Sequence, residues 1–305
     1  MRRLVINTST ASIAGRSVFR IGYGAAQLSR LHDRHDEAVA LLRRAVELGV
    51  NHVDTAEFYG FSFANTVIRQ ALRPEDDVLV VTKIGADPNP VGPVPLRIAQ
   101  RPEQLRASVE DNLRSLGLDQ LPVVNLRRLD TGPGLRPEGD QVVDLDDQLA
   151  TMTALRDEGK IGAIGLSSVT LDGLRRALPA GIACVQNAYS LVSRDDEDTL
   201  RLCMAEGIAW VPFFPLGGGF PSLPKVGDEP AVHAVAESLE VTPSQVALAW
   251  LLHHAPNILL IPGTVDPAHM EVNMAVGEIT FDAHTLAFLD AVESRSNNVA
   301  IGAAS

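Results

Sequence analysis

The chain has 305 residues, of which 46% are hydrophobic and 21% are charged, and its formal net charge is −12. This composition is ordinary for a globular protein with a sizeable core. Because an acidic chain has no basic field to attract phosphates, we expect no nucleic-acid partner and no anionic membrane partner. The two cysteines, Cys184 and Cys203, lie in apolar stretches, which argues against a disulfide framework and favours a cytoplasmic location.

Short apolar runs rich in β-branched residues alternate along the chain with helix-period segments. The runs predict strands at residues 18–24, 50–56, 78–85, 121–128, 161–168, 182–189, 208–215 and 258–264. The clearest helical segments cover residues 36–49, 102–117, 145–159 and 196–207, and each ends in glycine, a common helix terminator. Continuously apolar strands that alternate with amphipathic helices indicate a parallel sheet covered by helices.

Eight such units predict the α/β class and a (β/α)8 TIM barrel. We expect one domain over residues 1–305, with a short flexible tail from about residue 294. The rival architecture, a doubly wound sheet, has a G-x-G-x-x-G turn after its first strand. Residues 20–29 contain only Gly22 and Gly24, so the barrel is preferred.

Three polar residues follow adjacent predicted strands. Asp54 ends the second strand, Tyr59 lies in the loop after it, and Lys83 ends the third strand. A barrel carries its chemistry at the carboxyl ends of its strands, so these side chains can meet. Alone, an aspartate here could cap a helix, a lysine could pair with any acid, and a tyrosine could pack a loop. Together they predict an acid–base site.

Electrostatics gives the expected roles in this site. An ammonium about 4 Å from a phenol favours the phenolate by about 4 kcal/mol at an effective dielectric constant near 20. That is about the energy that shifts a phenol pKa from about 10 to about 7. We therefore expect Tyr59 to act as a general acid, Lys83 to activate it, and Asp54 to keep Lys83 protonated.

The segments "GVNHVDTAEFYG" (49–60), "VTKIG" (81–85) and "IPGTVDPAHMEVN" (261–273) resemble the aldo-keto reductases, in the order and spacing of that family. The resemblance implies a (β/α)8 barrel that binds NADP(H) without a Rossmann domain and transfers hydride between the nicotinamide and an aldehyde or ketone. It places Asp54, Tyr59 and Lys83 at the matching catalytic positions, with Tyr59 as the acid in reduction and the base in oxidation.

The same resemblance implies a set of cofactor contacts. Ser167, Ser168 and Gln186 would bind the carboxamide, and Phe213 would stack on the nicotinamide ring. The pyrophosphate would lie against Leu216, Gly217 and Gly218. The adenosine end would contact Gly263, Thr264, His269 and Asn273. Phe213 could instead be a core residue, and His269 a surface residue. Because Gly263, Thr264 and His269 replace a lysine, a serine and an arginine of many members, we expect NADP(H) while NAD(H) stays possible.

Most members have a histidine at the end of the fourth strand, where this chain has Arg127. An arginine there can donate to a carbonyl oxygen and stabilise a developing oxyanion; the alternative is that Arg127 points outward and pairs with Asp130. Its charge near Tyr59 leads us to expect reduction at neutral to mildly acidic pH. The stretches "VVNLRRLD" and "FFPLGG" are similar to those of the bacterial pyridoxal reductases. That likeness implies pyridoxal/pyridoxine or another small aromatic aldehyde as substrate.

Two other functions remain open. Lys83 could form a Schiff base in a lyase, although pairing with Asp54 disfavours a nucleophilic amine. The chain could also be a non-catalytic NADP(H)-binding regulatory subunit. We expect a small carbonyl substrate, no metal, and a monomer or small homo-oligomer. The loops expected to select the substrate cover residues 85–102, 130–141 and 217–230.

Overall fold

The computed structural model describes residues 9–91, 95–220 and 223–299. The strands are β1 (Thr10–Ile13), β2 (Arg16–Phe19), β3 (Tyr23–Gly24), β4 (His52–Asp54), β5 (Leu79–Ile84), β6 (Ala86–Pro88), β7 (Leu96–Ile98), β8 (Leu121–Arg127), β9 (Ile161–Ser167), β10 (Ile182–Gln186) and β11 (Ala209–Trp210). The α-helices are α1 (His35–Glu47), α2 (Phe63–Ala71), α3 (Pro102–Leu116), α4 (Leu145–Asp157), α5 (Leu171–Ala177), α6 (Glu197–Ala205), α7 (Pro230–Ser238), α8 (Pro243–His254), α9 (Pro267–Met274) and α10 (Ala283–Asp290).

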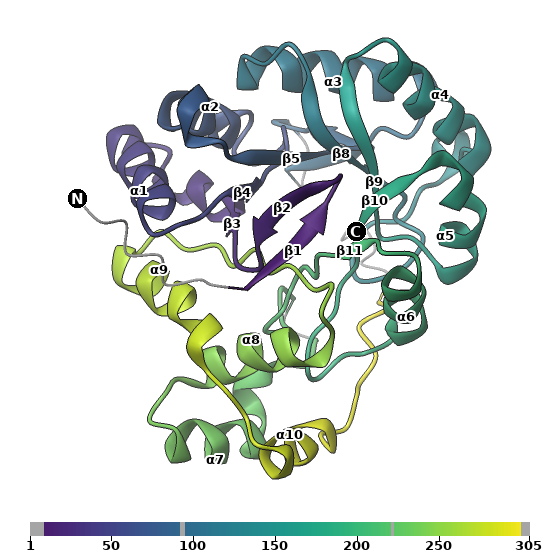
Figure 1. The fold of residues 1–305 in the computed structure, drawn as a ribbon. Coiled ribbons are helices and arrows are strands. Elements are labelled where there is room, and N and C mark those ends of the chain that lie inside the picture. Colours follow the sequence, from purple (N-terminus) through teal and green to yellow (C-terminus); the bar gives the residue numbers. More distant parts are fainter. Residues whose placement is uncertain (1–8, 92–94, 221–222, 300–305) are drawn as a thin grey trace.

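Seven strands form one parallel sheet in the order β11-β10-β9-β8-β5-β4-β3. Residues 258–260 close this sheet into a barrel, because they bridge both edge strands. Ile258 bridges to Trp210 of β11, and Leu260 bridges to Ile21 just before β3. Figure 1 looks along the barrel axis and shows the helices in a ring outside it. The predicted (β/α)8 barrel is therefore confirmed.

Alternation along the strands divides the apolar residues between two cores. Side chains such as Val53 and Leu126 face outward and pack against the helices in the larger core. Val81, Val123 and Leu259 face inward and fill the barrel in a smaller core. Each fully buried aliphatic side chain contributes about 1.5–3 kcal/mol to stability, so both cores hold the strand ends in fixed positions.

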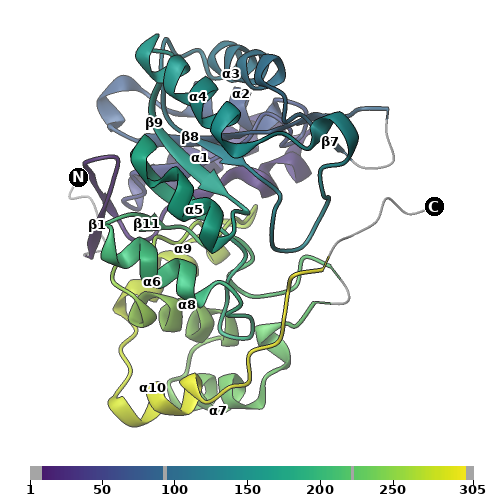
Figure 2. The same cartoon turned by 90° about the vertical axis from the view of Figure 1, so that its right-hand side faces the viewer.

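A hairpin that the sequence did not predict closes the amino-terminal end of the barrel. β1 and β2 pair antiparallel, and their residues Ile13 and Val18 join the inward-facing core. The hairpin crosses the middle of the ring in Figure 1 and lies opposite β7 in Figure 2. The interior is thus sealed at one end, which leaves the carboxyl ends of the strands as the open mouth.

Several helices begin at a capping aspartate or threonine. Asp144, Thr170, Thr242, Asp266 and Asp282 each accept a backbone N–H of the following first turn. These caps start helices α4, α5, α8, α9 and α10 at fixed points after the loops. No helix in the described part of the chain is long and apolar enough to span a membrane. Parts of the predicted substrate loops (92–94 and 221–222) and of the tail (300–305) lie outside the described residues.

Candidate active site

The carboxyl ends of β4 and β5 carry an ion pair inside the barrel. Asp54 ends β4, and Lys83 is the last residue but one of β5. Asp54 lies opposite Val81 in the register of the two parallel strands, so Lys83 extends one inward-facing position further. Lys83 Nζ donates to Asp54 Oδ1 and, at 3.0 Å, to the backbone oxygen of Thr55. Both charged side chains are more than nine-tenths buried.

Opposing effects set the charge of Lys83. Burial lowers the pKa of Lys83, but the charges of Asp54 and Tyr59 and hydrogen bonds with both residues raise the pKa, which ends above the ordinary value for lysine. A buried ammonium is stable only when it is paired and hydrogen-bonded. Lys83 therefore stays positively charged at neutral pH.

Tyr59 enters the same space from the loop after β4. Lys83 Nζ lies 5.0 Å from the centroid of the half-buried Tyr59 ring. The ring of Phe58 packs edge-on against the Tyr59 ring, with 5.1 Å between centroids. Residues 60–62 all have positive φ angles, of 65°, 54° and 71°. Since this conformation costs about 1–3 kcal/mol for a residue with a side chain, surrounding contacts must hold the loop in place.

Glu57 supplies those contacts, and sequence reasoning missed it. Its carboxylate accepts hydrogen bonds from Ser62 Oγ, from Asn65 Nδ2 at 2.6 Å and from Ser115 Oγ at 2.6 Å. Glu57 is only 9% exposed. It therefore ties the turn after Tyr59 to helices α2 and α3. The available signal was an acidic residue placed between Asp54 and Tyr59 in a mostly apolar context.

Arg127 ends β8 and reaches the mouth beside this loop. Its Cζ lies 5.3 Å from the centroid of the Phe58 ring. Burial lowers the pKa of Arg127, and the charge of Tyr59 opposes that effect. Arg128 Nε, not Arg127, pairs with Asp130, at 3.1 Å. The alternative in which Arg127 points outward is therefore wrong, because alternate residues of a strand face opposite sides.

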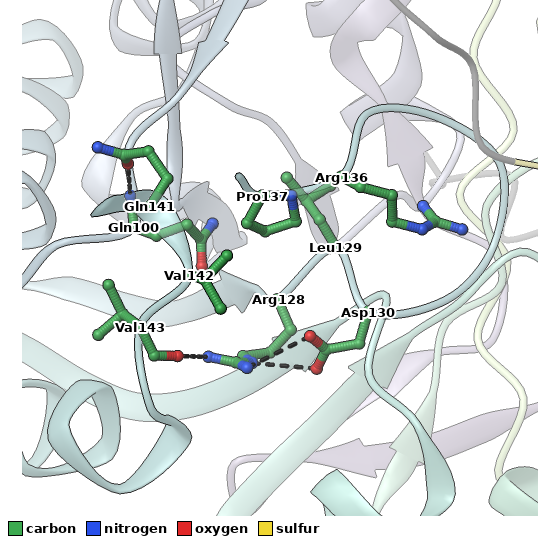
Figure 3. Close-up of a pocket in the computed structure, with 9 residues that line it drawn as sticks. All are labelled: Gln100, Arg128, Leu129, Asp130, Arg136, Pro137, Gln141, Val142 and Val143. Atoms are coloured by element: carbon green, nitrogen blue, oxygen red, sulfur yellow. Dashed lines mark hydrogen bonds and ion pairs between the residues drawn. The ribbon is translucent and has the colours of Figure 1, made fainter. Parts of the chain in front are cut away.

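A cavity of about 180 Å³ lies on the other side of this strand end. Its lining residues are Gln100, Arg128, Leu129, Asp130, Arg136, Pro137, Gln141, Val142 and Val143. In Figure 3 Arg128 and Asp130 face each other along one wall, while the side chain of Arg136 points away. Gln100 Nε2 donates to the backbone oxygens of Gly85 and Arg127, both at 2.7 Å. The cavity thus lies mainly among the residues that follow β8, on the Arg128 side of this strand end.

The predicted carboxamide residues lie together at the ends of β9 and β10. Ser167, Ser168 and Gln186 are all buried. Gln186 Nε2 donates to Asp54 Oδ2 at 2.6 Å. Gln186 Oε1 is buried and has no hydrogen-bond partner in the described part of the chain. Because a buried acceptor needs a donor, this atom suits the amide N–H of a bound carboxamide.

Phe213 follows β11 and is half-buried. Its backbone N–H donates to the oxygen of Asn187 at 3.1 Å, which fixes the residue beside the end of β10. Its ring lies 5.2 Å from that of Phe214, at an interplanar angle of 79°. Phe214 therefore contacts Phe213 edge to face and is not stacked on its ring. Stacking of Phe213 on a nicotinamide ring stays a prediction.

The glycine-containing loop after β11 folds back on itself. Gly217 N–H donates to the oxygen of Phe214 at 2.8 Å, and Gly218 N–H donates to the oxygen of Pro224 at 2.9 Å. The oxygen of Leu216 accepts a bond of 3.0 Å from Val226 N–H. Two of the amides predicted to face the pyrophosphate are therefore engaged within the loop in this conformation.

Gly263 and Thr264 lie against the residues around β3. A Cβ on Gly263 would lie 2.5 Å from the oxygen of Gly24, so only glycine fits this approach of two backbones. The oxygen of Thr264 accepts a hydrogen bond of 2.8 Å from the Tyr23 hydroxyl. Gly263, at the position where the resemblance implies a lysine in many members, therefore allows the two segments to pack closely.

His269 and Asn273 lie on α9. The side chain of His269 is 73% exposed, and its Nδ1 is 3.7 Å from Asp266 Oδ2. Asn273 is half-buried. Their contacts with the adenosine end of a cofactor stay predictions. The carboxylate of Asp266 caps α9 through the N–H groups of residues 268 and 269, so its negative charge lies at the start of this helix.

The described C-terminal residues bind loops at the barrel mouth. Asn297 is buried and donates from Nδ2 to the oxygen of Ala188 at 3.2 Å. Asn298 Oδ1 accepts a bond of 2.8 Å from Arg136. In Figure 2 this yellow segment runs toward the same end of the barrel as β7. The sequence offered no signal for these contacts, since residues 294–299 have no periodic pattern.

A family model described as "Aldo/keto reductase family" matches residues 20–294. The chain is 42% identical over 297 residues to pyridoxine 4-dehydrogenase of Escherichia coli (strain K12), covering 94% of this chain and 99% of that protein. It is 33% identical over 289 residues to an uncharacterized oxidoreductase of Schizosaccharomyces pombe, covering 92% of this chain and 89% of that one.

Solved structures show the same fold. A thermostable aldo-keto reductase in complex with the inhibitor epalrestat is 25% identical, with a TM-score of 0.77, and the match covers 93% of this chain and 100% of that chain. An aldo-keto reductase from Klebsiella pneumoniae in complex with NADPH is 24% identical, with a TM-score of 0.77, covering 96% and 99% of the two chains.

Proposed function

Because the chain belongs to the aldo/keto reductase family, whose members are oxidoreductases acting on C=O and CH–OH groups, we propose a specific reaction for it. It transfers hydride between NADP(H) and a small aromatic aldehyde or alcohol, of which pyridoxal/pyridoxine is the first candidate. One observation carries the proposal: the buried Asp54–Lys83 pair lies beneath the Tyr59 ring. The likeness to pyridoxine 4-dehydrogenase supports the choice of substrate.

The residues divide the work of carbonyl reduction. NADPH, when bound, would supply the hydride. Tyr59 gives its phenolic proton to the carbonyl oxygen, and the ammonium of Lys83 stabilises the phenolate that remains. Asp54 keeps that ammonium charged, while Arg127 donates an N–H to the developing oxyanion. In the oxidative direction the Tyr59 phenolate accepts the alcohol proton. Lys83 and Arg127 stabilise that phenolate.

The cofactor assignment rests on the polar atoms around Gln186. Ser167, Ser168 and the free Oε1 of Gln186 would hold the carboxamide, and Phe213 would cover the ring. The solved Klebsiella relative contains NADPH, which supports NADP(H). With Gly263 and Thr264 in place of lysine and serine, and Asp266 nearby, few charges favour the 2′-phosphate, so NADH should also serve.

A Schiff-base lyase is a less well supported function for the same residues. It needs a neutral, nucleophilic Lys83. Since the ion pair with Asp54 raises the pKa of Lys83 above its ordinary value, the amine is protonated and is not a nucleophile at neutral pH.

The experiment is to follow the oxidation of NADPH and of NADH by absorbance, with pyridoxal and a panel of simple aldehydes. We expect turnover of aromatic aldehydes with both cofactors and faster turnover with NADPH. Borohydride should not trap substrate on the protein. Absence of turnover with every aldehyde, while NADPH still binds, would point instead to the non-catalytic role.

A further inference from the structure

Arg127 carries an unbalanced charge at the mouth of the barrel. No acidic side chain in the described ranges forms an ion pair with its guanidinium, which lies instead over the Phe58 ring at 5.3 Å. The residue is half-buried. A cation in such a place is costly unless an anion approaches it. Tyr59 offers one only as a phenolate, and in reduction it must begin as a phenol.

The adjacent Arg128 shows how this chain satisfies a structural arginine. Its guanidinium pairs with Asp130 at 3.1 Å, donates to the backbone oxygen of Val143 at 3.0 Å, and donates to Gln148 Oε1. Every edge of that fork has a protein partner. The guanidinium of Arg127, one residue earlier, forms none of these contacts in the described part of the chain. The backbone oxygen of Arg127, by contrast, accepts a hydrogen bond from Gln100 at 2.7 Å.

The chemistry of the guanidinium suggests what its partner is. Arginine presents several N–H donors in a rigid planar fork that suits two neighbouring oxygens, at least one of them negative. A carbonyl oxygen alone uses only one of these donors. Many family members perform that task with histidine, which has no fork and no permanent charge.

We propose that Arg127 determines substrate specificity by binding an aromatic aldehyde through two oxygens: the carbonyl oxygen and an ionised hydroxyl on the adjacent ring carbon. This inference rests on the proposed function and names the substrate class more closely. Pyridoxal belongs to the class, because its ring hydroxyl lies next to the formyl group. Phe58 supports the guanidinium from below through a cation–π contact, which leaves the edge of the fork for the substrate.

The test compares the wild-type protein on 2-hydroxybenzaldehyde, 4-hydroxybenzaldehyde and 2-methoxybenzaldehyde with NADPH. All three rings are electron-rich, but only the first can present an oxyanion beside the carbonyl. A charge-assisted hydrogen bond is worth about 10- to 100-fold in affinity. We expect kcat/KM for the 2-hydroxy compound to exceed that for the other two by about this factor. KM for this compound should fall as its phenol ionises, while KM for the 2-methoxy compound stays flat with pH.

Two variants assign the preference to Arg127. Arg127→Lys keeps the charge and loses the fork, and Arg127→His restores the residue of many family members. Both should lower turnover of all three aldehydes, because the oxyanion donor is altered, and should lower kcat/KM for the 2-hydroxy compound about 10- to 100-fold further, so that its preference is lost. Equal ratios in wild type and variants, or no preference in the wild type, would overturn the inference and leave the proposed function standing. No turnover of any aldehyde would overturn both.

Discussion

Gln186 and Asp54 form one unit, because Gln186 Nε2 donates a 2.6 Å hydrogen bond to the carboxylate oxygen that Lys83 leaves free. Sequence reasoning placed Gln186 with the cofactor and Asp54 with the acid–base residues. The amide nitrogen of Gln186 holds Asp54, and its buried oxygen has no hydrogen-bond partner in the described part of the chain. If that oxygen binds the carboxamide of the cofactor, as we propose, cofactor binding and proton transfer are coupled at this residue.

Replacing Gln186 by leucine should weaken cofactor binding and slow catalysis together. The change removes the acceptor for the carboxamide and leaves one oxygen of Asp54 without its donor. Losing a buried hydrogen bond costs about 1–3 kcal/mol, so we expect the Kd for NADPH to rise about 10- to 100-fold in a fluorescence titration, with a fall in kcat. Gln120→Leu is the control, since the Gln120 side chain is exposed and donates to the backbone oxygen of Gly159 at 2.9 Å. An unchanged Kd would remove Gln186 from the cofactor site.

Tyr59→Phe should separate chemistry from binding. Phenylalanine keeps the ring contacts with Phe58 and Lys83 and loses the hydroxyl, which is the proposed proton donor and a hydrogen-bond partner of Lys83. General acid catalysis contributes about 100- to 10,000-fold, so kcat should fall at least about 100-fold while the Kd for NADPH stays the same. Tyr189→Phe serves as the matched control, because the Tyr189 hydroxyl bonds to Glu197 and His254 away from the mouth. A near-normal rate in Tyr59→Phe would reject Tyr59 as the acid.

Asp196 should make the protein less stable as the pH rises. Burial raises the pKa of Asp196 to about 7, against a hydrogen bond from Asn187 that lowers the pKa and a charge on Asp195 that raises it. The folded protein therefore keeps a proton that the unfolded chain releases near pH 4. The stabilisation is complete below that pH and is lost as the pH rises toward 7.

Asp196→Asn removes this dependence. Relative to wild type, its free energy of unfolding in urea should increase between pH 4 and pH 8, by up to about 4 kcal/mol for three pKa units. Parallel stability curves for the two proteins over that range would show that Asp196 is ionised in the folded state.

The barrel and the Asp54–Lys83 pair at its mouth could be predicted because both follow from local pattern. Apolar runs at regular spacing define the strands, and strand ends of a parallel barrel meet at one mouth. Asp54 and Lys83 were therefore found as neighbours from sequence order alone. The same rule located Arg127, although its side chain direction needed the register of β8.

Other features depend on long-range packing that no local pattern shows. Residues 10–19 seal the barrel as a hairpin, yet their alternation is too short to distinguish from a loop. The barrel interior near Gly165 is also closely packed. A Cβ on Gly165 would lie 2.0 Å from Asn125 Oδ1 and 2.7 Å from Cys184 Sγ, so an apparently permissive glycine is required by two distant residues.

Glu57 should act as a positioning residue for Tyr59. Glutamine in its place keeps the shape of the side chain but turns one of two acceptor oxygens into a donor, which faces the donors of Ser62, Asn65 and Ser115. The turn at residues 60–62, which holds positive φ angles, would then lose the contacts that offset its strain. We expect Glu57→Gln to lower kcat about 10-fold or more and to leave the Kd for NADPH unchanged.

If Glu57 served stability only, Glu57→Gln would lower the melting temperature without lowering kcat. Asp290→Asn provides the comparison, because Asp290 accepts a 2.8 Å bond from Trp250 Nε1 far from the mouth. Both variants should lower the melting temperature, but only Glu57→Gln should reduce kcat at temperatures where the protein is fully folded. Ser62→Gly adds a second measurement. Glycine adopts the positive φ angle of this position without strain, but it lacks the hydroxyl that donates to Glu57. If all three variants kept the wild-type kcat, Tyr59 would be held by the barrel alone and the Glu57 contacts would serve stability only.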